Sequence, residues 1–298
     1  MGVMLKLAAV AAFTCMGALI KATDGRVPAG EVVFFRSLFA IPIMLLWLGV
    51  MGQLRAGIRT ERPLAHMVRG LIGTTAMGLG FAGLLLLPLP DVTALQYAMP
   101  IFVVIFSAVF LGEGIRLFRV SAVIIGLVGV LIVLWPRLTG LTGLTSGGLS
   151  EREAFGAVIV LVGAMIAAVA QLIVRKLVET ERPVTVALYF AFSSTTISLF
   201  SIPFGWVWPS TFDAGLLIGA GAIGGLAQGL MSTSYRYAPA STLAPFDYSS
   251  MIFAVVIGYV FFLEVPTMTT LMGAALVILA GIVIVLRERH LAKGQARV

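Results

Sequence analysis

The chain has 298 residues, of which 60% are hydrophobic and only 11% are charged, and its mean hydropathy is +1.08. A soluble domain carries about 25% charged residues, so this composition excludes an ordinary soluble protein and indicates a chain solvated by a lipid bilayer. The net charge of +7 does not indicate a nucleic-acid partner, because the basic residues are spread between apolar runs. The single cysteine, Cys15, excludes an internal disulfide framework.

Ten apolar runs follow one another along the chain, each close to the roughly 17–25 residues that a membrane-spanning helix requires. Backbone groups in lipid must be satisfied within the segment, so continuous runs of this length predict helices, whereas barrel strands would alternate polar and apolar residues. The sequence therefore predicts an all-α membrane protein with ten transmembrane helices. They cover approximately residues 4–22, 30–51, 65–87, 91–111, 120–135, 155–174, 184–206, 214–236, 241–263 and 268–286.

Lysine and arginine are distributed unequally between the two sides of the predicted bundle. Fifteen of the 20 basic residues fall on the side that holds the N-terminus, and the remaining five fall on the other side. Cytoplasmic segments of membrane proteins carry the excess of positive charge, so both termini are predicted to be cytoplasmic.

The chain contains an internal repeat. Pro88 aligns with Pro239 and Tyr97 aligns with Tyr248, which is an offset of 151 residues. At this offset, 14 of the 44 positions between 70 and 113 are identical to their partners. Shared apolar composition would give about a third as many matches, and proline and tyrosine are not generic membrane residues. We therefore expect the two halves of the chain to be duplicates.

Each half holds five predicted spans, so the second copy must enter the membrane from the opposite side. Inverted repeats related by an axis in the membrane plane are a transporter architecture, because exchange of packing between the halves gives alternating access. We expect a first five-helix repeat at 1–138, a Gly/Thr/Ser-rich extracytoplasmic linker at 139–154, a second inverted repeat at 155–290, and a cytoplasmic tail at 291–298.

Long segments of the sequence resemble the EamA-type drug/metabolite transporters. They are FFRSLFAIPIMLL in the second span, PLPDVTALQYAMPIFVVIFSAVFLGEGIRLFRVSAVIIGLVGVLIVL, and its echo APASTLAPFDYSSMIFAVVIGYVFFLEVPTMTTLMGAALVILAGIVIVL. The second copy departs from the L-G-E pattern with Leu263-Glu264-Val265. The resemblance implies ten helices in two inverted bundles and export or uptake of small metabolites, with amino-acid exporters a prominent subgroup. It also implies a bacterial inner-membrane protein, and export as the direction of transport.

Asp247 is the clearest ionisable residue inside a predicted span, where a charge is costly and usually faces the bundle interior. The repeat pairs Asp247 with Gln96, Tyr97 with Tyr248, and Met77 with Gln228. Inverted symmetry would place these pairs at one central interface, where transporter sites lie. The predicted substrate-binding residues are Gln96, Tyr97, Gln228, Asp247, Tyr248 and Ser249, with Met77 and Gln171 as further candidates.

Alternative interpretations stand beside this one. Asp247 could lie near the cytoplasmic water boundary and form only local hydrogen bonds, and the Tyr and Gln side chains could join helices rather than contact substrate. Asp247, Glu31 and Arg36 are candidates for gating or proton coupling. For Glu31 and Arg36, five residues apart near the outer end of span two, the preferred interpretation is a snorkelling interfacial pair, and an external gate is the alternative.

Other functions fit the sequence less well. It contains no HExxH, GxSxG or P-loop motif, and both histidines fall at predicted cytoplasmic edges, so we predict neither catalytic residues, nor a metal site, nor a cofactor. A channel would need rings of like groups. A lipid scramblase or another non-transport membrane protein remains an alternative.

The candidate pocket suits amino acids or similar metabolites, including aromatic or other neutral ones. Carriers of phosphorylated substrates need several buried Lys or Arg residues, and only Lys21 and Arg36 are expected near membrane depth. This expectation favours zwitterions, and a drug-like cation is the alternative substrate. Since one chain holds both halves, we expect a functional monomer.

Overall fold

The computed structural model describes residues 1–111, 117–139, 151–238 and 240–295, and every regular element in these ranges is a helix. The first half contains α1 (Gly2–Lys21), α2 (Ala29–Val50), α3 (Leu54–Ile58), α4 (Pro63–Leu84), α5 (Leu89–Gln96), α6 (Ala98–Leu111) and α7 (Leu117–Thr139). The second half contains α8 (Glu151–Leu177), α9 (Pro183–Ser198), η2 (Leu199–Phe204), α10 (Thr211–Tyr237), α11 (Ala240–Leu243), η3 (Ala244–Ser249), α12 (Ser250–Phe262) and α13 (Met268–Gln295).

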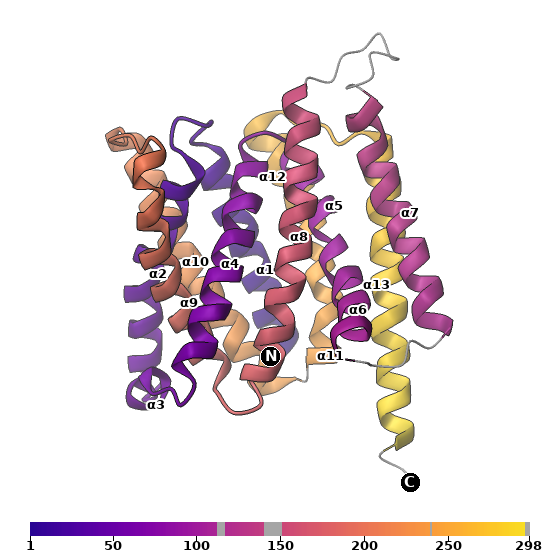
Figure 1. Cartoon of the computed structure of the whole chain (residues 1–298), viewed down its shortest axis with the longest axis horizontal. Helices are drawn as coiled ribbons and strands as arrows, with labels where there is room; N and C mark the ends of the chain where they lie inside the picture. Colours follow the sequence, from indigo (N-terminus) through magenta and orange to yellow (C-terminus); the bar gives the residue numbers. More distant parts are fainter. Residues whose placement is uncertain (112–116, 140–150, 239, 296–298) are drawn as a thin grey trace.

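The helices confirm the predicted membrane architecture. Within the described residues, 8 helical segments are long and apolar enough to cross a membrane, and shorter apolar stretches lie at Val123–Pro136 in α7 and Met268–Val283 in α13. Each of the ten predicted spans therefore has a helical counterpart (Figure 1). The fifth predicted span, 120–135, lies within α7, a helix of 23 residues. Most of the linker expected at 139–154 lies outside the described residues, and α8 begins within it, at Glu151.

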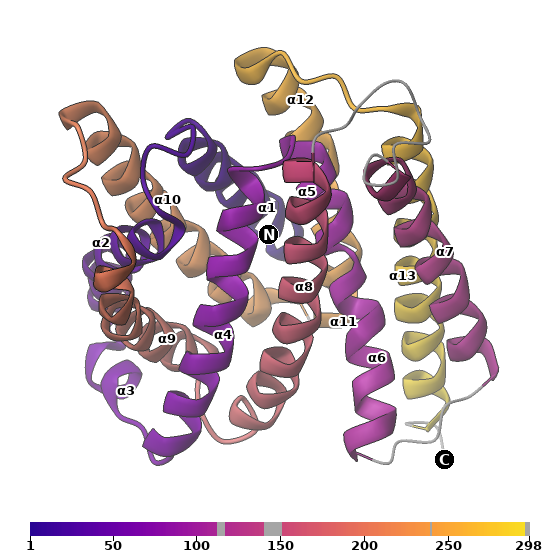
Figure 2. The same ribbon diagram turned by 45° about the horizontal axis from the view of Figure 1, so that its top comes forward.

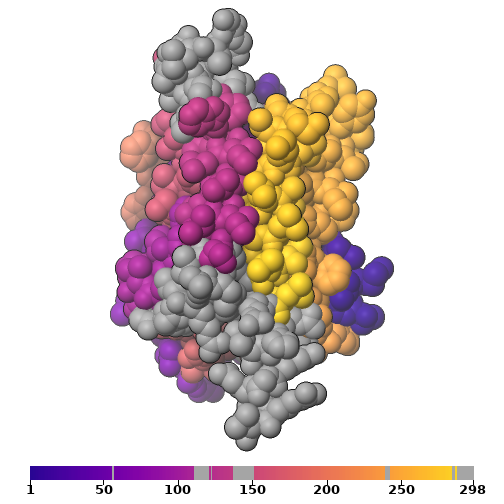
Figure 3. All heavy atoms as spheres, turned by 90° about the vertical axis from the view of Figure 1, so that its right-hand side faces the viewer, coloured from indigo at the N-terminus to yellow at the C-terminus, as the bar shows by residue number. Residues whose placement is uncertain are grey.

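Helices from the two halves pack together in pairs. α1 packs against α10, α4 against α8, α2 against α9, and α5 against α12. α7 and α13 form a further pair at one side of the molecule, where Figures 2 and 3 show them side by side. Small residues allow this close approach, because a Cβ added at Gly273 would lie 2.6 Å from the carbonyl oxygen of Gly129.

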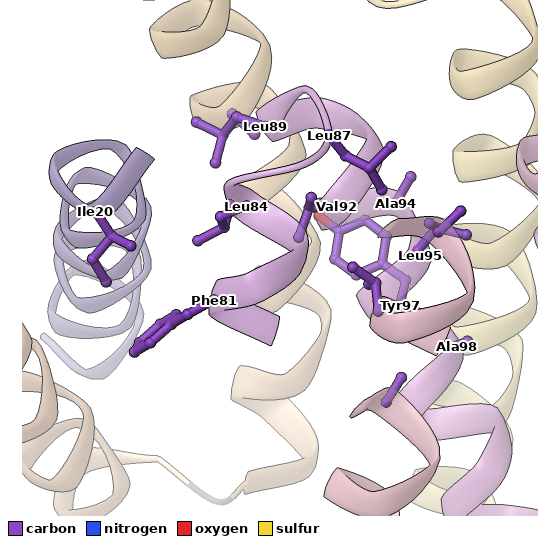
Figure 4. Close-up of a cluster of buried hydrophobic side chains, with 14 of the residues drawn as sticks. Ile20, Phe81, Leu84, Leu87, Leu89, Val92, Ala94, Leu95, Tyr97 and Ala98 are labelled. Atoms are coloured by element: carbon purple, nitrogen blue, oxygen red, sulfur yellow. The ribbon is translucent and has the colours of Figure 1, made fainter. Parts of the chain in front are cut away.

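A continuous apolar core surrounds the start of α5. Phe81 and Leu84 at the end of α4 and Val92 on α5 lie close together, and Tyr97 follows at the end of α5 (Figure 4). The core also includes Ile20 of α1. This packing holds the turn between α4 and α5 against the end of α1.

Two predicted spans are interrupted at equivalent places in the repeat. The fourth span stops at Gln96 and resumes at Ala98, with Tyr97 between α5 and α6. The ninth span begins with the short helix α11, changes to the 3-10 helix η3, which has Pro245 in its first turn, and continues as α12 from Ser250. A proline supplies no backbone donor and so favours such a break. Interrupted backbone at membrane depth is tolerated where it is buried or lines a cavity.

Candidate binding cavity

A cavity of about 640 Å³ lies between helices of the two halves. Helices α1, α4, α5 and α8 supply most of its wall, and α2, α6, α9, α10, α13 and the segment from η3 to α12 supply the rest. Its lining is mainly apolar, with small residues such as Gly80 and Ala164 and a few polar side chains. This composition is typical of a site for a small molecule.

Residues at equivalent positions of the repeat line the cavity together. Gln96 and its partner Asp247 both lie in the wall. The same holds for four further pairs, which are Gly80 with Met231, Thr93 with Ala244, Tyr97 with Tyr248, and Met99 with Ser250. The interrupted spans thus meet the cavity with corresponding residues.

The cavity collects most of the residues that the sequence singles out as substrate-binding candidates. Those in the wall are Met77, Gln96, Tyr97, Gln171, Asp247 and Tyr248. Gln228 and Ser249 are absent from the described lining, although both are partly buried. The hydroxyl of Ser249 donates instead to the carbonyl of Phe246 at 2.7 Å, within its own helical turn. Substrate contact remains a prediction for all eight residues.

Tyr97 and Tyr248 join the two interrupted spans. Their rings are 5.2 Å apart between centroids and meet edge to face at 74°. The Tyr97 hydroxyl donates to the backbone carbonyl of Tyr248 at 3.0 Å and lies 2.7 Å from the Ser250 hydroxyl. Aromatic pairs of this geometry contribute about 0.5–1.5 kcal/mol beyond their area burial. The tyrosine pair therefore holds the interruption of the fourth span against the interruption of the ninth span.

Asp247 pairs with Lys6, one of the fifteen basic residues predicted on the cytoplasmic side. The Lys6 ammonium on α1 lies 2.6 Å from Oδ1 of Asp247, and the Lys6 side chain is 1% exposed whereas that of Asp247 is 49% exposed. Lys6 also contacts the Met231 sulfur at 3.1 Å and lies over the Tyr235 ring. The carboxylate therefore faces the cavity while its counter-ion is buried behind it.

Two arginines line the same cavity. Arg36 of α2 is buried, and Arg69 of α4 lies with its guanidinium carbon 3.5 Å from the centroid of the Phe190 ring. Arg69, one of the fifteen basic residues predicted on the cytoplasmic side, thus reaches the cavity together with Arg36. The argument against phosphorylated substrates, which counted Lys21 and Arg36 but not Arg69, is weakened by this second arginine.

Glu31 and Arg36 do not form the interfacial pair favoured from the sequence. Both are buried, and Glu31 Oε2 accepts the backbone N–H of Val207 at 3.0 Å. Arg36 Nε contacts the Met16 sulfur at 3.5 Å instead. Residues five apart on a helix point to different faces, because only spacings of three and four bring side chains together. Arg36 thus lines the cavity, and Glu31 is absent from the described lining.

The far end of α1 carries a second set of charged contacts. Lys21 lies 2.9 Å from Oε1 of Glu264 and donates to the carbonyls of Leu84 and Leu87. Glu264 Oε2 accepts the backbone N–H of Leu89 at 2.8 Å. Glu264 therefore forms a structural salt bridge at this end of α1.

A neighbouring ion pair joins the connection between α1 and α2 to α10. Arg26 donates to Asp213 at 2.8 and 3.1 Å, and this hydrogen bond raises the pKa of Arg26 above its ordinary value. Asp213 also accepts from the hydroxyl of Ser210, the N-cap residue of α10. These contacts hold the first connection of the chain against the start of α10.

The fold defines a multi-pass membrane protein, and its helices enclose a cavity. The chain belongs to the EamA-like transporter family, whose model matches residues 1–135 and 154–287. The resemblance of the sequence to this family is thereby confirmed.

Characterised relatives of the chain are transporters of small molecules. The pseudopaline exporter of Pseudomonas aeruginosa is 30% identical over 94% of this chain and 94% of its own length. The S-adenosylmethionine uptake transporter of Rickettsia bellii is 27% identical, covering 89% of this chain and 86% of its own. A riboflavin transporter of Vibrio cholerae is 28% identical, covering 85% and 81%. One solved crystal structure shares the fold, with a TM-score of 0.64 at 20% identity over 97% of this chain and 98% of that one.

Proposed function

We propose that the chain is a secondary transporter that moves a small metabolite across the membrane by alternating access through the central cavity. The observation that carries this proposal is the set of repeat-equivalent residues that line one cavity, such as Gln96 with Asp247 and Tyr97 with Tyr248. A site built twice from one motif, at the contact of two halves, can be exposed to either side when the halves exchange their packing.

The helix pairs support two inverted repeats. If α1 corresponds to α8 and α4 to α10, the contact of α1 with α10 is the counterpart of the contact of α4 with α8, and both exist. The family model also matches the chain in two separate segments. We assign the repeats to 1–138 and 155–290 with both termini cytoplasmic, as the basic residues predict.

The cavity departs from the symmetry of the repeat at one predicted position. Met77 lines the cavity, whereas its repeat partner Gln228 is absent from the described lining. Alternating access predicts such a difference, because at any moment the two halves hold different conformations. Both halves of the repeat line this cavity, which supports a functional monomer.

Amino acids or similar metabolites are the proposed substrates, and export is the proposed direction. The support is a small, mainly apolar cavity with tyrosine and glutamine side chains that can both donate and accept hydrogen bonds. The named relatives carry three different compounds, so identities of 27–30% support the class of transporter and not one substrate.

The test is transport by the purified chain in proteoliposomes, with a panel of radiolabelled amino acids, S-adenosylmethionine and riboflavin, and with a pH gradient present or absent. Ala167→Trp on α8 fills the cavity, and Val162→Trp on the same helix adds the same bulk at an exposed, lipid-facing position. We expect the wild type and Val162→Trp to transport and Ala167→Trp to lose at least 90% of the rate, roughly tenfold.

Equal transport by both tryptophan variants would contradict a route through this cavity. If none of the compounds moves while a labelled phospholipid is redistributed between leaflets, the chain is a scramblase and the proposal fails.

A further inference from the structure

The two cavity arginines lack the partners that buried cations normally have. Among the described residues, neither Arg36 nor Arg69 forms a salt bridge. Buried Nε and Nη1 of Arg69 have no hydrogen-bond acceptor in the described part of the chain. Arg36 is 7% exposed, and its only hydrogen bond to a described residue goes to the sulfur of Met16.

Repeat-equivalent glycines make room for both guanidinium groups. A Cβ added at Gly73 would lie 3.0 Å from Nη1 of Arg69 and 2.9 Å from the ring of Phe190. A Cβ added at Gly224 would lie 3.4 Å from Nε of Arg36. Gly73 and Gly224 are partners in the internal repeat. The repeated motif therefore presents a glycine to each arginine, as a built site would.

The charges around the cavity are unbalanced. Asp247 is the only acidic side chain in the described lining, and Lys6 already neutralises it. A buried charge without a partner destabilises a protein, so its persistence at membrane depth indicates a functional site. Arginine presents a planar set of donors that matches a carboxylate, and it holds such anions more firmly than water does in a site of low dielectric constant.

We propose that Arg36 and Arg69 bind the carboxylate of the transported molecule, so that the substrates are organic carboxylates and not organic cations. The proposal rests on the proposed function, since it names the substrate class of the same cavity. The two positive charges repel each other, the Arg36 guanidinium donates to the Met16 sulfur, and the Arg69 guanidinium lies over the Phe190 ring. A bound carboxylate supplies the missing acceptors.

The test is binding to the purified full chain in lipid nanodiscs, measured by calorimetry, with two sets of matched probes. Succinate, succinamide and 1,4-diaminobutane share a four-carbon chain and differ in charge. L-phenylalanine and L-phenylalaninamide differ only at the carboxyl group. The variants are Arg36→Gln and Arg69→Gln, and Arg55→Gln at an exposed position of α3 is the matched control.

We expect succinate or L-phenylalanine to bind and the amides and the diamine not to bind. Each cavity variant should weaken carboxylate binding by about tenfold to hundredfold, the size of a lost charge-assisted hydrogen bond, and Arg55→Gln should leave it unchanged. Without ligand, Arg36→Gln and Arg69→Gln should unfold at the same or a higher temperature than the wild type. A purely structural arginine would show the opposite shift.

The outcomes separate the two proposals. Carboxylate binding that depends on the arginines, without transport in proteoliposomes, would support this site and contradict the transporter. Transport that is unaffected by either cavity variant would overturn the carboxylate site and leave the transporter standing. Failure of both carboxylates to bind the wild type, or equal binding of acid and amide, would also overturn it.

Discussion

α1 carries a lysine near each end, and the two lysines form ion pairs of different kinds. Lys21 and Glu264 are 14% and 16% exposed, and both also bond to backbone groups between Leu84 and Leu89. Lys6 is 1% exposed, but its partner Asp247 is 49% exposed and faces the cavity. Lys21 and Glu264 thus have several partners within the protein. In the Lys6–Asp247 pair, by contrast, another cation or a proton can reach the carboxylate. The comparison indicates that the Lys21 end of α1, called here the static end, keeps its ion pair, whereas at the Lys6 end the carboxylate can change partners.

The largest effect should come from Asp247→Asn, which leaves the buried Lys6 ammonium without its counter-ion. We expect transport to fall at least tenfold and the free energy of unfolding to fall by about 1–3 kcal/mol. Proteoliposome transport and thermal unfolding are the measurements. The double variant Lys6→Met with Asp247→Asn should recover the stability but not the transport. Full activity in that double variant would remove Asp247 from the mechanism.

The next effect concerns the static end. Glu264→Ala removes both the partner of Lys21 and the acceptor of the Leu89 N–H, and it should lower the free energy of unfolding by about 1–2 kcal/mol. Glu264→Gln keeps an oxygen for Leu89 and should lose about half as much. Thermal unfolding distinguishes the two variants. If they were equally unstable, the backbone contact would contribute nothing.

The tyrosine pair gives a smaller and more specific effect. Tyr97→Phe removes the donor to the carbonyl of Tyr248 and should cost about 1 kcal/mol of unfolding free energy. Tyr248→Phe should cost less than about half of that, because the Tyr248 hydroxyl has no hydrogen bond to a described residue. Urea or thermal unfolding of both variants is the measurement, and equal losses would contradict the assigned asymmetry.

The smallest effect should be a gain at Leu263, beside Glu264. Leu263 closes α12 with φ 56° and ψ 28°, a left-handed conformation that glycine adopts without steric penalty. Leu263→Gly should raise the free energy of unfolding by up to about 1 kcal/mol, and Leu263→Ala, which keeps a Cβ, should not. A rise in unfolding temperature in both variants would mean that exposure of the leucine, and not its backbone, is responsible.

The fold was largely predictable because the bilayer sets the length of every span. The position of the interrupted spans was also accessible, since the repeat aligns Tyr97, where the first break lies, with Tyr248, two residues before α12 begins. The repeat also aligns Leu263, which has a left-handed backbone, with Gly112, which lies outside the described residues.

The cavity was predictable only in part. Repeat symmetry identified Gln96, Asp247 and both tyrosines, since equivalent residues meet at a two-fold interface. It could not reveal Lys6 or Arg69, because basic residues near helix ends usually mark the cytoplasmic side and were counted only as such. The sequence did hold a signal that Arg69 is not at a helix end. Arg69 follows the first residue of α4 by six positions, which is about 9 Å along the helix axis.

The contact of Gly129 with Gly273 limits how this protein can be engineered. Replacing a helical glycine by alanine commonly stabilises a protein by about 0.5–1 kcal/mol, and such replacements are a usual route to samples robust enough for crystallography. Between α7 and α13 the same change would force the helices apart, because each backbone occupies the space that a methyl group would need. At Gly49 and Gly215 no neighbouring atom lies within 4 Å of the added carbon, so thermostabilising libraries should begin there and leave the helix crossings untouched.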